Sequence, residues 1–427
     1  MAALVCRVAD AKDGAHCESR ATTWGRPYTE ATMIAEKRST QTILEQDAQH
    51  NSGLWNPNIA FTHGEGVYIF DADGNKYIDC LAGIAVASVG HNNKRLANAL
   101  AEQAQRLIIC TQAHGNDTRV EFYEKLFTFI PEWMGLSRVF MANSGSEANE
   151  AALKWARAAT GRPGFVSAKR GFSGRTLGVL ALTWEKKYRE PFEPLKYDNT
   201  FIKYNSVEEL DAAVTDETAA VFLEPVQGEG GMHPATKPFL EAARQLCDER
   251  GALLIMDEVQ SGVGRTGKFL ATEYYDIRPD MVTLAKGLGG GVPIGALLMS
   301  EAVAQKMPKG GHGTTFGGNA LASAAAVAVL DEIEERRLLE NASEVGNYFI
   351  NRLADIDSPK IREVRGLGLM IGVELKEKVA PYIDALKDKG VMTINAGATV
   401  IRFVPPLIIT KEQVDEVIER FAEVLSA

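Results

Sequence analysis

The chain has 427 residues, 45% of them hydrophobic and 24% charged, a composition typical of a folded globular protein with two domains. Lys and Arg number 46 against 56 Asp and Glu, and the net charge of −10 argues against a surface for nucleic acid or anionic membrane. No apolar run reaches the ~18–20 residues that cross a bilayer, and the N-terminus does not resemble a secretory signal. We therefore predict a cytoplasmic protein.

The cysteines and histidines are scattered along the chain. The five cysteines form no CxxC pair, which predicts no disulfide framework and fits a reducing compartment. The seven histidines form no HxH or HxxxH pair, so we predict no metal site.

The N-terminal part contains one recognisable motif. Residues 1–35 are polar and lack periodicity, and we expect a loosely ordered extension there. Two short strand-like runs, 67–70 and 76–79, flank a turn at 71–74, which predicts a β-hairpin. We expect residues 36–90 to pack with a smaller C-terminal domain.

Between residues 91 and 325, short apolar runs alternate with amphipathic stretches such as 238–250. This alternation predicts an α/β domain with a mainly parallel sheet and helices on both faces. The predicted strands are 138–142, 165–168, 219–223, 252–257, 281–285 and 294–299.

Residues 326–427 are predicted to form the smaller α+β domain. A long helical segment runs from about 320 to 339, strand-like pieces follow at 360–375 and 391–406, and a last helix spans 412–425.

The clearest anion site follows the first predicted strand of the large domain, where a helix opens. Ser144 and Glu147 have capping-box spacing. Gly145 lets the backbone approach a ligand, and Ser146 adds a hydroxyl to the free N–H groups of the helix start. A phosphate site and a capped helix without a ligand both fit this stretch alone.

Two charged residues end apolar strands. Asp257, followed by Glu258, ends the run 252–256, at the carboxyl edge where such sheets bind ligands. Lys286 ends the run 281–285. Burial disfavours a charged amine and prepares it for Schiff-base chemistry. The alternatives are a helix cap for Asp257 and a lysine reaching solvent for Lys286.

Residues 262–268 match GxGxxG and also GxxxxGK, except that Phe269 replaces the Ser or Thr that would hold magnesium. In both nucleotide-binding motifs the first glycine directly follows a strand. Here residues 258–261 intervene, so a nucleotide-binding switch is disfavoured.

The helix start, Asp257 and, 29 residues later, Lys286 together resemble pyridoxal-phosphate (PLP) enzymes of fold type I, and among them the class III aminotransferases. The resemblance runs from about Gly66 to the C-terminus. It is carried by six motifs in order, at 143–150, 171–176, 224–231, 256–260, 283–286 and 313–319.

Within this class the sequence is most similar to acetylornithine aminotransferases and to aminotransferases acting on lysine held by the amino-group carrier protein LysW. Three stretches favour the carrier-linked branch: 172–175, 184–191 and 358–366. Ser173 stands where acetylornithine enzymes usually have His, and Ala320 replaces a common proline.

This branch implies ω-amino-group transfer between LysW-linked aminoadipate semialdehyde or lysine and 2-oxoglutarate or glutamate, in lysine biosynthesis. The same chemistry on N-acetylornithine, in arginine biosynthesis, is the alternative. An aminomutase and a non-catalytic cofactor-binding or interaction protein are more remote, and the intact pair of Asp257 and Lys286 argues against the last of these.

The resemblance also implies residue roles. Lys286 would bind PLP covalently and move the substrate proton, and Asp257 would keep the pyridine nitrogen protonated. Thr315 would come from the other subunit of a homodimer with shared active sites. The implied cofactor-binding residues are Gly145, Ser146, Phe172, Asp257, Glu258, Val259, Gln260, Lys286 and Thr315. The implied substrate-binding residues are Arg175, Thr314, Glu229 and Arg402, the last two as an ion pair that opens for glutamate.

Overall fold

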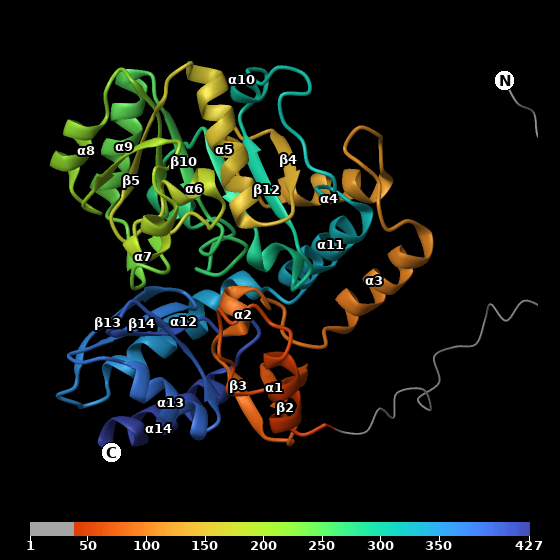
Figure 1. Ribbon diagram of the computed structural model, residues 1–427, viewed down its shortest axis with the longest axis vertical. Helices are drawn as coiled ribbons and strands as arrows, with labels where there is room; N and C mark the ends of the chain where they lie inside the picture. Colours follow the sequence, from red (N-terminus) through yellow and green to blue (C-terminus); the bar gives the residue numbers. More distant parts are fainter. Residues whose placement is uncertain (1–37) are drawn as a thin grey trace, which may run out of the picture. The chain divides into compact units, whose positions relative to one another are not determined.

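The computed structural model describes residues 38–427, and the extension predicted at 1–35 lies outside them. The chain divides into two units, one ending at Asn58 and the other running from Ile59 to Ala427. In the first unit, helix α1 (Thr40–Ala48) is capped by the Ser39 hydroxyl, which accepts the N–H of Thr42 at 3.2 Å. The second unit contains the sheets and the remaining helices (Figure 1).

The second unit is built on a seven-stranded sheet with the strand order β4-β12-β11-β10-β7-β5-β6. All neighbouring pairs from β11 to β6 are parallel, whereas β12 is antiparallel to β11 and β4. The mainly parallel α/β sheet is thus confirmed. Its strands are β4 (Arg138–Ala142), β5 (Gly164–Ala168), β6 (Asp198–Ile202), β7 (Thr218–Leu223), β10 (Leu253–Asp257), β11 (Met281–Leu284) and β12 (Gly295–Met299).

Strand β6 was not among the predicted strands, because it lies at the sheet edge and its sequence, Asp-Asn-Thr-Phe-Ile, has a single buried residue. Such an edge strand has one paired neighbour and carries little of the apolar pattern that marks buried strands.

Alternating residues of the central strands face two separate apolar cores. Ile255 of β10 packs in one core with the alanines of α5 (Gly145–Thr160). Its neighbours Leu254 and Met256 face the opposite core, which includes α9 (Lys237–Arg250). This period of two fixes the sheet between helical layers. It also brings the carboxyl ends of β4, β10 and β11 to one edge.

Helices α3 (Lys94–Arg106), α4 (Asp117–Thr128) and α11 (Ala320–Glu335) pack together beside the sheet (Figure 1). The predicted helical segment 320–339 is interrupted at Arg337, whose φ of 52° cannot continue a right-handed helix. A new helix, α12 (Leu338–Ala354), begins there. Ala320 is the first residue of α11, a position at which proline is also tolerated.

The predicted N-terminal hairpin forms as β2 (Tyr68–Asp71) and β3 (Lys76–Asp79), with β1 (Phe61–Glu65) beside β2. Strand β3 also pairs in parallel with β15 (Val391–Met392), so the first and last parts of this unit share one sheet. The domain boundaries at 90 and 325 stay predictions.

A second four-stranded sheet has the order β13-β14-β17-β16, with neighbouring strands antiparallel. Its strands are β13 (Ile361–Leu367), β14 (Met370–Leu375), β16 (Ile394–Ala396) and β17 (Val400–Phe403). Helix α12 packs against this sheet, and α14 (Lys411–Ser426) packs against α12.

The remaining elements are short. Strands β8 (Val226–Gln227) and β9 (His233–Pro234) pair antiparallel on either side of the loop that carries Glu229. These elements are α2 (Ala82–Ala85), α6 (Leu177–Leu180), α7 (Lys186–Arg189), α8 (Val207–Ala213), β8 (Val226–Gln227), β9 (His233–Pro234), α10 (Glu301–Ala304) and α13 (Ala380–Asp388). Over residues 38–427, the helices are all too short or too polar to cross a membrane.

Candidate active site

A cavity of about 310 Å³ lies at the carboxyl edge of the large sheet, where β4, β10 and β11 end. Eight of the residues predicted from the sequence line it: Gly145, Ser146, Phe172, Glu229, Asp257, Val259, Gln260 and Lys286. These residues come from five separate sequence motifs, so the sheet topology is what assembles them.

Lys286 follows β11 and begins a short 3-10 helix, Lys286–Gly289. Its φ of 38° lies in a region that residues with side chains rarely adopt, as is common at functional sites. Burial, together with the nearby charge of Arg402, lowers the pKa of the Lys286 amine to about 8. A substantial fraction of the amine is therefore neutral and nucleophilic near pH 8.

Asp257 ends β10 and is almost completely buried. Its carboxylate accepts hydrogen bonds from Asn149 Nδ2 at 2.8 Å and from the N–H of Val259 at 3.0 Å. Burial nevertheless raises the pKa of Asp257 to about 6. A cation in the cavity facing this carboxylate would stabilise its ionised form.

The start of α5 forms the anion-binding end of the cavity. The Ser144 hydroxyl accepts the N–H of Glu147 at 3.2 Å, as the spacing predicted. The Glu147 carboxylate accepts the N–H of Asn143 at 3.0 Å, one residue before the helix cap, so the full capping box does not form. A methyl group on Gly145 would lie 2.6 Å from the Val259 side chain, so this close approach requires glycine.

Glu229 lines the cavity, and Arg402, 173 residues away in the sequence, contacts it from outside the cavity wall. Arg402 Nη1 donates to Glu229 Oε1 at 2.6 Å and to Gln260 Oε1 at 3.2 Å. The side chain of Arg402 is 1% exposed, whereas that of Glu229 is 33% exposed. The arginine is therefore fixed on β17, and the carboxylate is on a loop with access to solvent.

The structure does not bring Glu258 to the cavity. Its buried carboxylate accepts hydrogen bonds from Ser261 Oγ at 2.5 Å and from the N–H of Thr272 at 2.6 Å. These bonds tie the end of β10 to the following loop and direct the side chain away from Asp257.

Three further predicted residues lie outside the cavity wall. Arg175 is exposed, with its guanidinium 3.4 Å from the centre of the Tyr188 ring. Thr314 Oγ1 accepts a hydrogen bond from Asn143 Nδ2 at 2.8 Å. Thr315 is exposed, and its contribution to a partner's site stays a prediction.

Asn149 and Glu224 are two of the cavity residues that the sequence-based set did not include. Asn149 lies one turn after Gly145 on α5 and donates to both Asp257 and the carbonyl of Ser173. A polar residue on an otherwise alanine-rich helix face was the available signal.

The second missing residue, Glu224, accepts the N–H groups of Phe172 and Gly228, both at 3.0 Å. Burial and the nearby Asp257 raise the pKa of Glu224 to about 8. Its position at the head of the motif 224–231 was the available signal.

The glycine-rich loop 262–268 packs against the C-terminal part of the chain and lines neither this cavity nor the larger one beside it. Its Arg265 is buried and donates to the carbonyls of Leu369, at 3.1 Å, and Pro405, at 2.5 Å. The glycines of this loop serve close packing, because a methyl group on Gly262, Gly264 or Gly267 would lie 2.8–2.9 Å from neighbouring atoms.

Comparison with known proteins places the chain in a family. A family model described as aminotransferase class-III matches residues 50–425. A [LysW]-aminoadipate semialdehyde transaminase from Deinococcus radiodurans is 49% identical over 398 residues, 92% of each chain. An acetylornithine aminotransferase from Archaeoglobus fulgidus is 45% identical over 361 residues, 84% of this chain and 94% of that one.

Among solved structures, an ornithine aminotransferase from Toxoplasma gondii, with PLP at partial occupancy in its active site, superposes with a TM-score of 0.86. It is 32% identical, and the match covers 92% of this chain and 96% of that one. The extent of these matches and the shared fold establish that the chain belongs to the class III aminotransferases, which are PLP-dependent enzymes of fold type I.

Proposed function

We propose that the enzyme transfers an ω-amino group between LysW-linked aminoadipate semialdehyde or lysine and 2-oxoglutarate or glutamate, in lysine biosynthesis. The observation that carries the proposal is the convergence of Lys286, Asp257 and the pair Glu229–Arg402 on one cavity. The 49% identity to a LysW-linked transaminase over 92% of the chain supports the carrier-linked substrate. N-acetylornithine is the alternative, supported by the 45% identical relative.

The residues present fit PLP. The free N–H groups at the start of α5 and the close approach at Gly145 suit its phosphate. The carboxylate of Asp257 and the unpartnered, buried Oδ1 of Asn149 suit a polar ring edge. The lowered pKa of Lys286 suits attack on an aldehyde. When bound, PLP supplies that aldehyde and a ring that takes up electrons from the substrate carbon.

The chain's own residues would then divide the work as follows. Gly145 and Ser146 hold the phosphate, Phe172 stacks on the ring, and Gln260 contacts its phenolic oxygen. Asp257 holds a proton at the ring nitrogen, because a buried carboxylate favours a cation beside it. Lys286 binds the aldehyde and, once released, moves the proton of the amine-bearing substrate carbon. Val259 contributes to the wall beside Gly145.

The pair Glu229–Arg402 would adapt one site to two substrates. With an ω-amine in place, no carboxylate lies near the reacting carbon, and Glu229 neutralises Arg402. With glutamate in place, its α-carboxylate takes over the guanidinium and Glu229 withdraws, which its flexible, glycine-rich loop permits.

Single substitutions in this pair are therefore expected to act unequally on the two half-reactions. Arg402→Ala should lower kcat/KM for glutamate by about 10- to 100-fold, the range for a lost hydrogen bond to a charged group. Glu229→Ala should lower the KM for glutamate and weaken discrimination for the ω-amine. Stopped-flow measurement of each half-reaction tests this, with Glu423→Ala, in an exposed pair with Lys389 at 2.6 Å, as control. Equal losses in both half-reactions would show that Glu229 and Arg402 form a structural ion pair and do not distinguish the two substrates.

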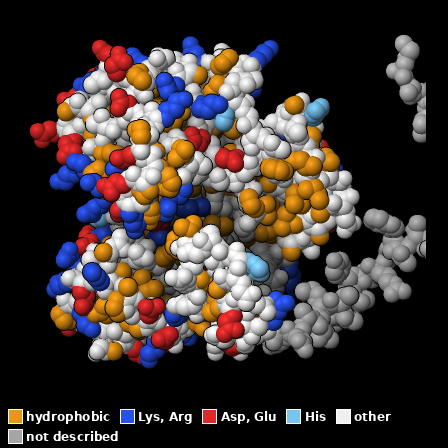
Figure 2. All heavy atoms as spheres, viewed as in Figure 1, with side chains coloured by type: hydrophobic (Ala, Val, Ile, Leu, Met, Phe, Trp, Pro, Cys, Tyr) orange, Lys and Arg blue, Asp and Glu red, His pale blue; other side chains and the backbone are white. Residues whose placement is uncertain are grey.

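A homodimer with shared active sites is part of the proposal. Leu107, Ile108, Ile109 and Phe316 are 43–61% exposed, and the N–H of Leu321, in the first turn of α11, donates to the Ile108 carbonyl. Figure 2 shows an apolar patch over α3 and α11. Such patches are typical of subunit interfaces. Thr315 adjoins the exposed Phe316 in the sequence. The free thiols of Cys80, Cys110 and Cys247 support a cytoplasmic location.

The substrate assignment is tested by comparing turnover of LysW-linked lysine with turnover of N-acetylornithine, using 2-oxoglutarate as acceptor. We expect kcat/KM at least about tenfold higher for the carrier-linked amine, equivalent to ~1.4 kcal/mol of extra binding to the transition state. A preference for N-acetylornithine would instead assign the enzyme to arginine biosynthesis. Product formation without any amino acceptor would indicate an aminomutase.

A further inference from the structure

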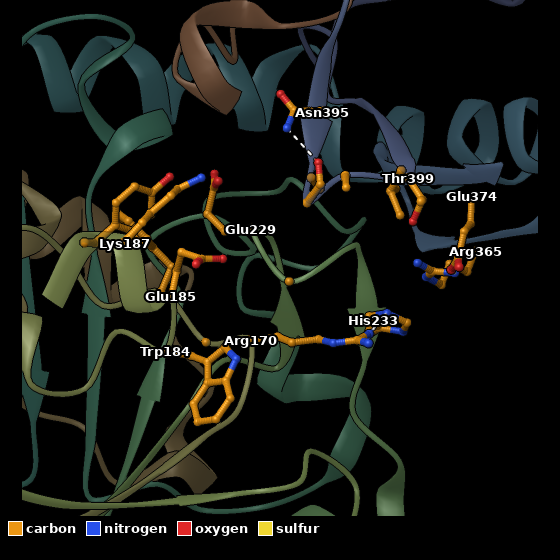
Figure 3. A pocket seen from close by; sticks show the side chains of 18 residues that line it. Arg170, Trp184, Glu185, Lys187, Glu229, His233, Arg365, Glu374, Asn395 and Thr399 are labelled. Atoms are coloured by element: carbon orange, nitrogen blue, oxygen red, sulfur yellow. Dashed lines mark hydrogen bonds and ion pairs between the residues drawn. The ribbon is translucent and has the colours of Figure 1, made fainter. Parts of the chain in front are cut away.

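A second cavity, of about 590 Å³, lies beside the first, and the two share Phe172 and Glu229 in their walls. We call it the outer chamber. Its walls come from segments far apart in the sequence: residues 170–172, residues 184–188 around α7, strand β13 and residues 395–400 (Figure 3). The inner cavity holds the residues proposed for cofactor chemistry, so the outer chamber is space for a part of the substrate beyond the reacting group.

The three stretches that favour the carrier-linked branch meet at this chamber. Residues 172–175 contribute Phe172, residues 184–191 contribute Lys187 among others, and residues 358–366 contribute Arg365. None of the three supplies Lys286 or Asp257. Members of the class share the cofactor chemistry of the inner cavity. We therefore expect differences in substrate specificity between them to arise where these three stretches converge.

Most charges in the outer chamber already have partners. Arg365 Nη1 donates to Glu374 at 2.7 Å, and its Nε donates to the Gly231 carbonyl at 2.7 Å, next to the loop of Glu229. Glu229 is engaged by Arg402. These pairs build the wall and leave no net charge for a ligand.

Two cations that line the outer chamber have no carboxylate partner among residues 38–427. Arg170 extends to His233, with Nη1 3.3 Å from Nε2, and Figure 3 shows it spanning this side of the chamber. Lys187 Nζ lies 4.8 Å from the centre of the Tyr188 ring. Glu185 is the single unpaired carboxylate of the lining in the described part of the chain. The two unpaired cations therefore outnumber it, and the unpaired charge of the lining is positive.

The position of Arg170 is fixed by its backbone. Its φ of 67° is costly for a residue with a side chain and persists only where neighbours enforce it. Gly230 allows that backbone to come close, because a methyl group there would lie 2.7 Å from the Arg170 carbonyl. The backbone from which the guanidinium extends is therefore held beside the loop that carries Glu229.

We propose that the outer chamber binds a carboxylate-bearing peptide segment of the carrier protein, on Arg170 and Lys187, while the attached amino group reaches Lys286. This inference rests on the proposed function. Carboxylates would form charge-assisted hydrogen bonds with both cations, and a free small substrate would leave the chamber unused.

The test compares the double variant Arg170→Gln/Lys187→Gln with the matched control Lys186→Gln. Lys186 is the adjacent lysine, 69% exposed, and does not line the chamber. For each enzyme, kcat/KM is measured with LysW-linked lysine, N-acetylornithine and glutamate. We expect the double variant to lower the value for LysW-linked lysine by about tenfold or more relative to the other two substrates, mainly through KM.

Two further measurements distinguish recognition from structural damage. The charge-preserving variant Arg170→Lys/Lys187→Arg should restore most of the loss, and added salt should reduce the advantage of the wild type on the carrier-linked substrate. Equal losses on all three substrates, or no loss on LysW-linked lysine, would overturn this inference and leave the proposed function standing. A wild-type enzyme that turns over only N-acetylornithine would refute the proposed function and the inference with it.

Discussion

Replacing Lys286 with alanine should lower the rate of amino-group transfer by about 10⁴-fold or more, because one amine supplies both the covalent attachment and the proton transfer. The cofactor should still bind, since its phosphate would be held at the start of α5. Measured transfer between the amine substrate and 2-oxoglutarate gives the loss, and equilibrium dialysis gives cofactor retention. Transamination near the wild-type rate would refute the role of Lys286.

The matched control is Lys268→Ala. Lys268 is exposed on the glycine-rich loop and lines neither cavity. Its replacement should leave transfer and cofactor binding unchanged. The pH dependence of the cofactor's absorbance should change only in the Lys286 variant, because only that variant lacks the amine that would attach the cofactor.

Replacing Asp257 with asparagine should slow removal of the substrate proton by about 150- to 5,000-fold, the equivalent of the 3–5 kcal/mol lost when one partner of a buried charge pair is removed. An amide cannot balance the charge of a protonated ring nitrogen. Binding of the amine substrate should change much less. Single-turnover kinetics with a substrate deuterated at the reacting carbon separate the two steps, and the isotope effect should increase.

Folding of this variant is not expected to suffer. The new side-chain oxygen can accept either the Val259 N–H or the Asn149 amide, so one of these two hydrogen bonds to residue 257 is kept. Burial raises the pKa of Asp257 above its usual value, so the folded protein without cofactor loses stability as pH rises from about 4 to about 6. The amide removes that cost, and Asp257→Asn without cofactor should unfold no more readily than wild type at pH 7. Asp248→Asn, in an exposed pair with Arg244 at 2.8 Å, serves as control. Equal slowing of substrate binding and proton removal would make Asp257 a structural residue only.

The sequence by itself determined the family, the sheet and the candidate residues at strand ends. Strands β10 and β11 are buried on both faces, so they appear as apolar runs, and the polar residues that end them, Asp257 and Lys286, are conspicuous. The Glu229–Arg402 contact was also predictable, because an arginine in an apolar strand needs an anionic partner and a motif supplied one.

Only the tertiary structure decided which way side chains turn and what distant loops enclose. Glu258 adjoins Asp257 yet points away, because successive residues at a strand end face opposite sides and Thr272 supplies donors there. The role of Glu224 depends on its contacts with Phe172 and Gly228. The outer chamber around Arg170 likewise depends on contacts between loops that are separated by tens of residues. Local propensity and periodicity carry no information about such contacts, since chain packing alone brings these loops together.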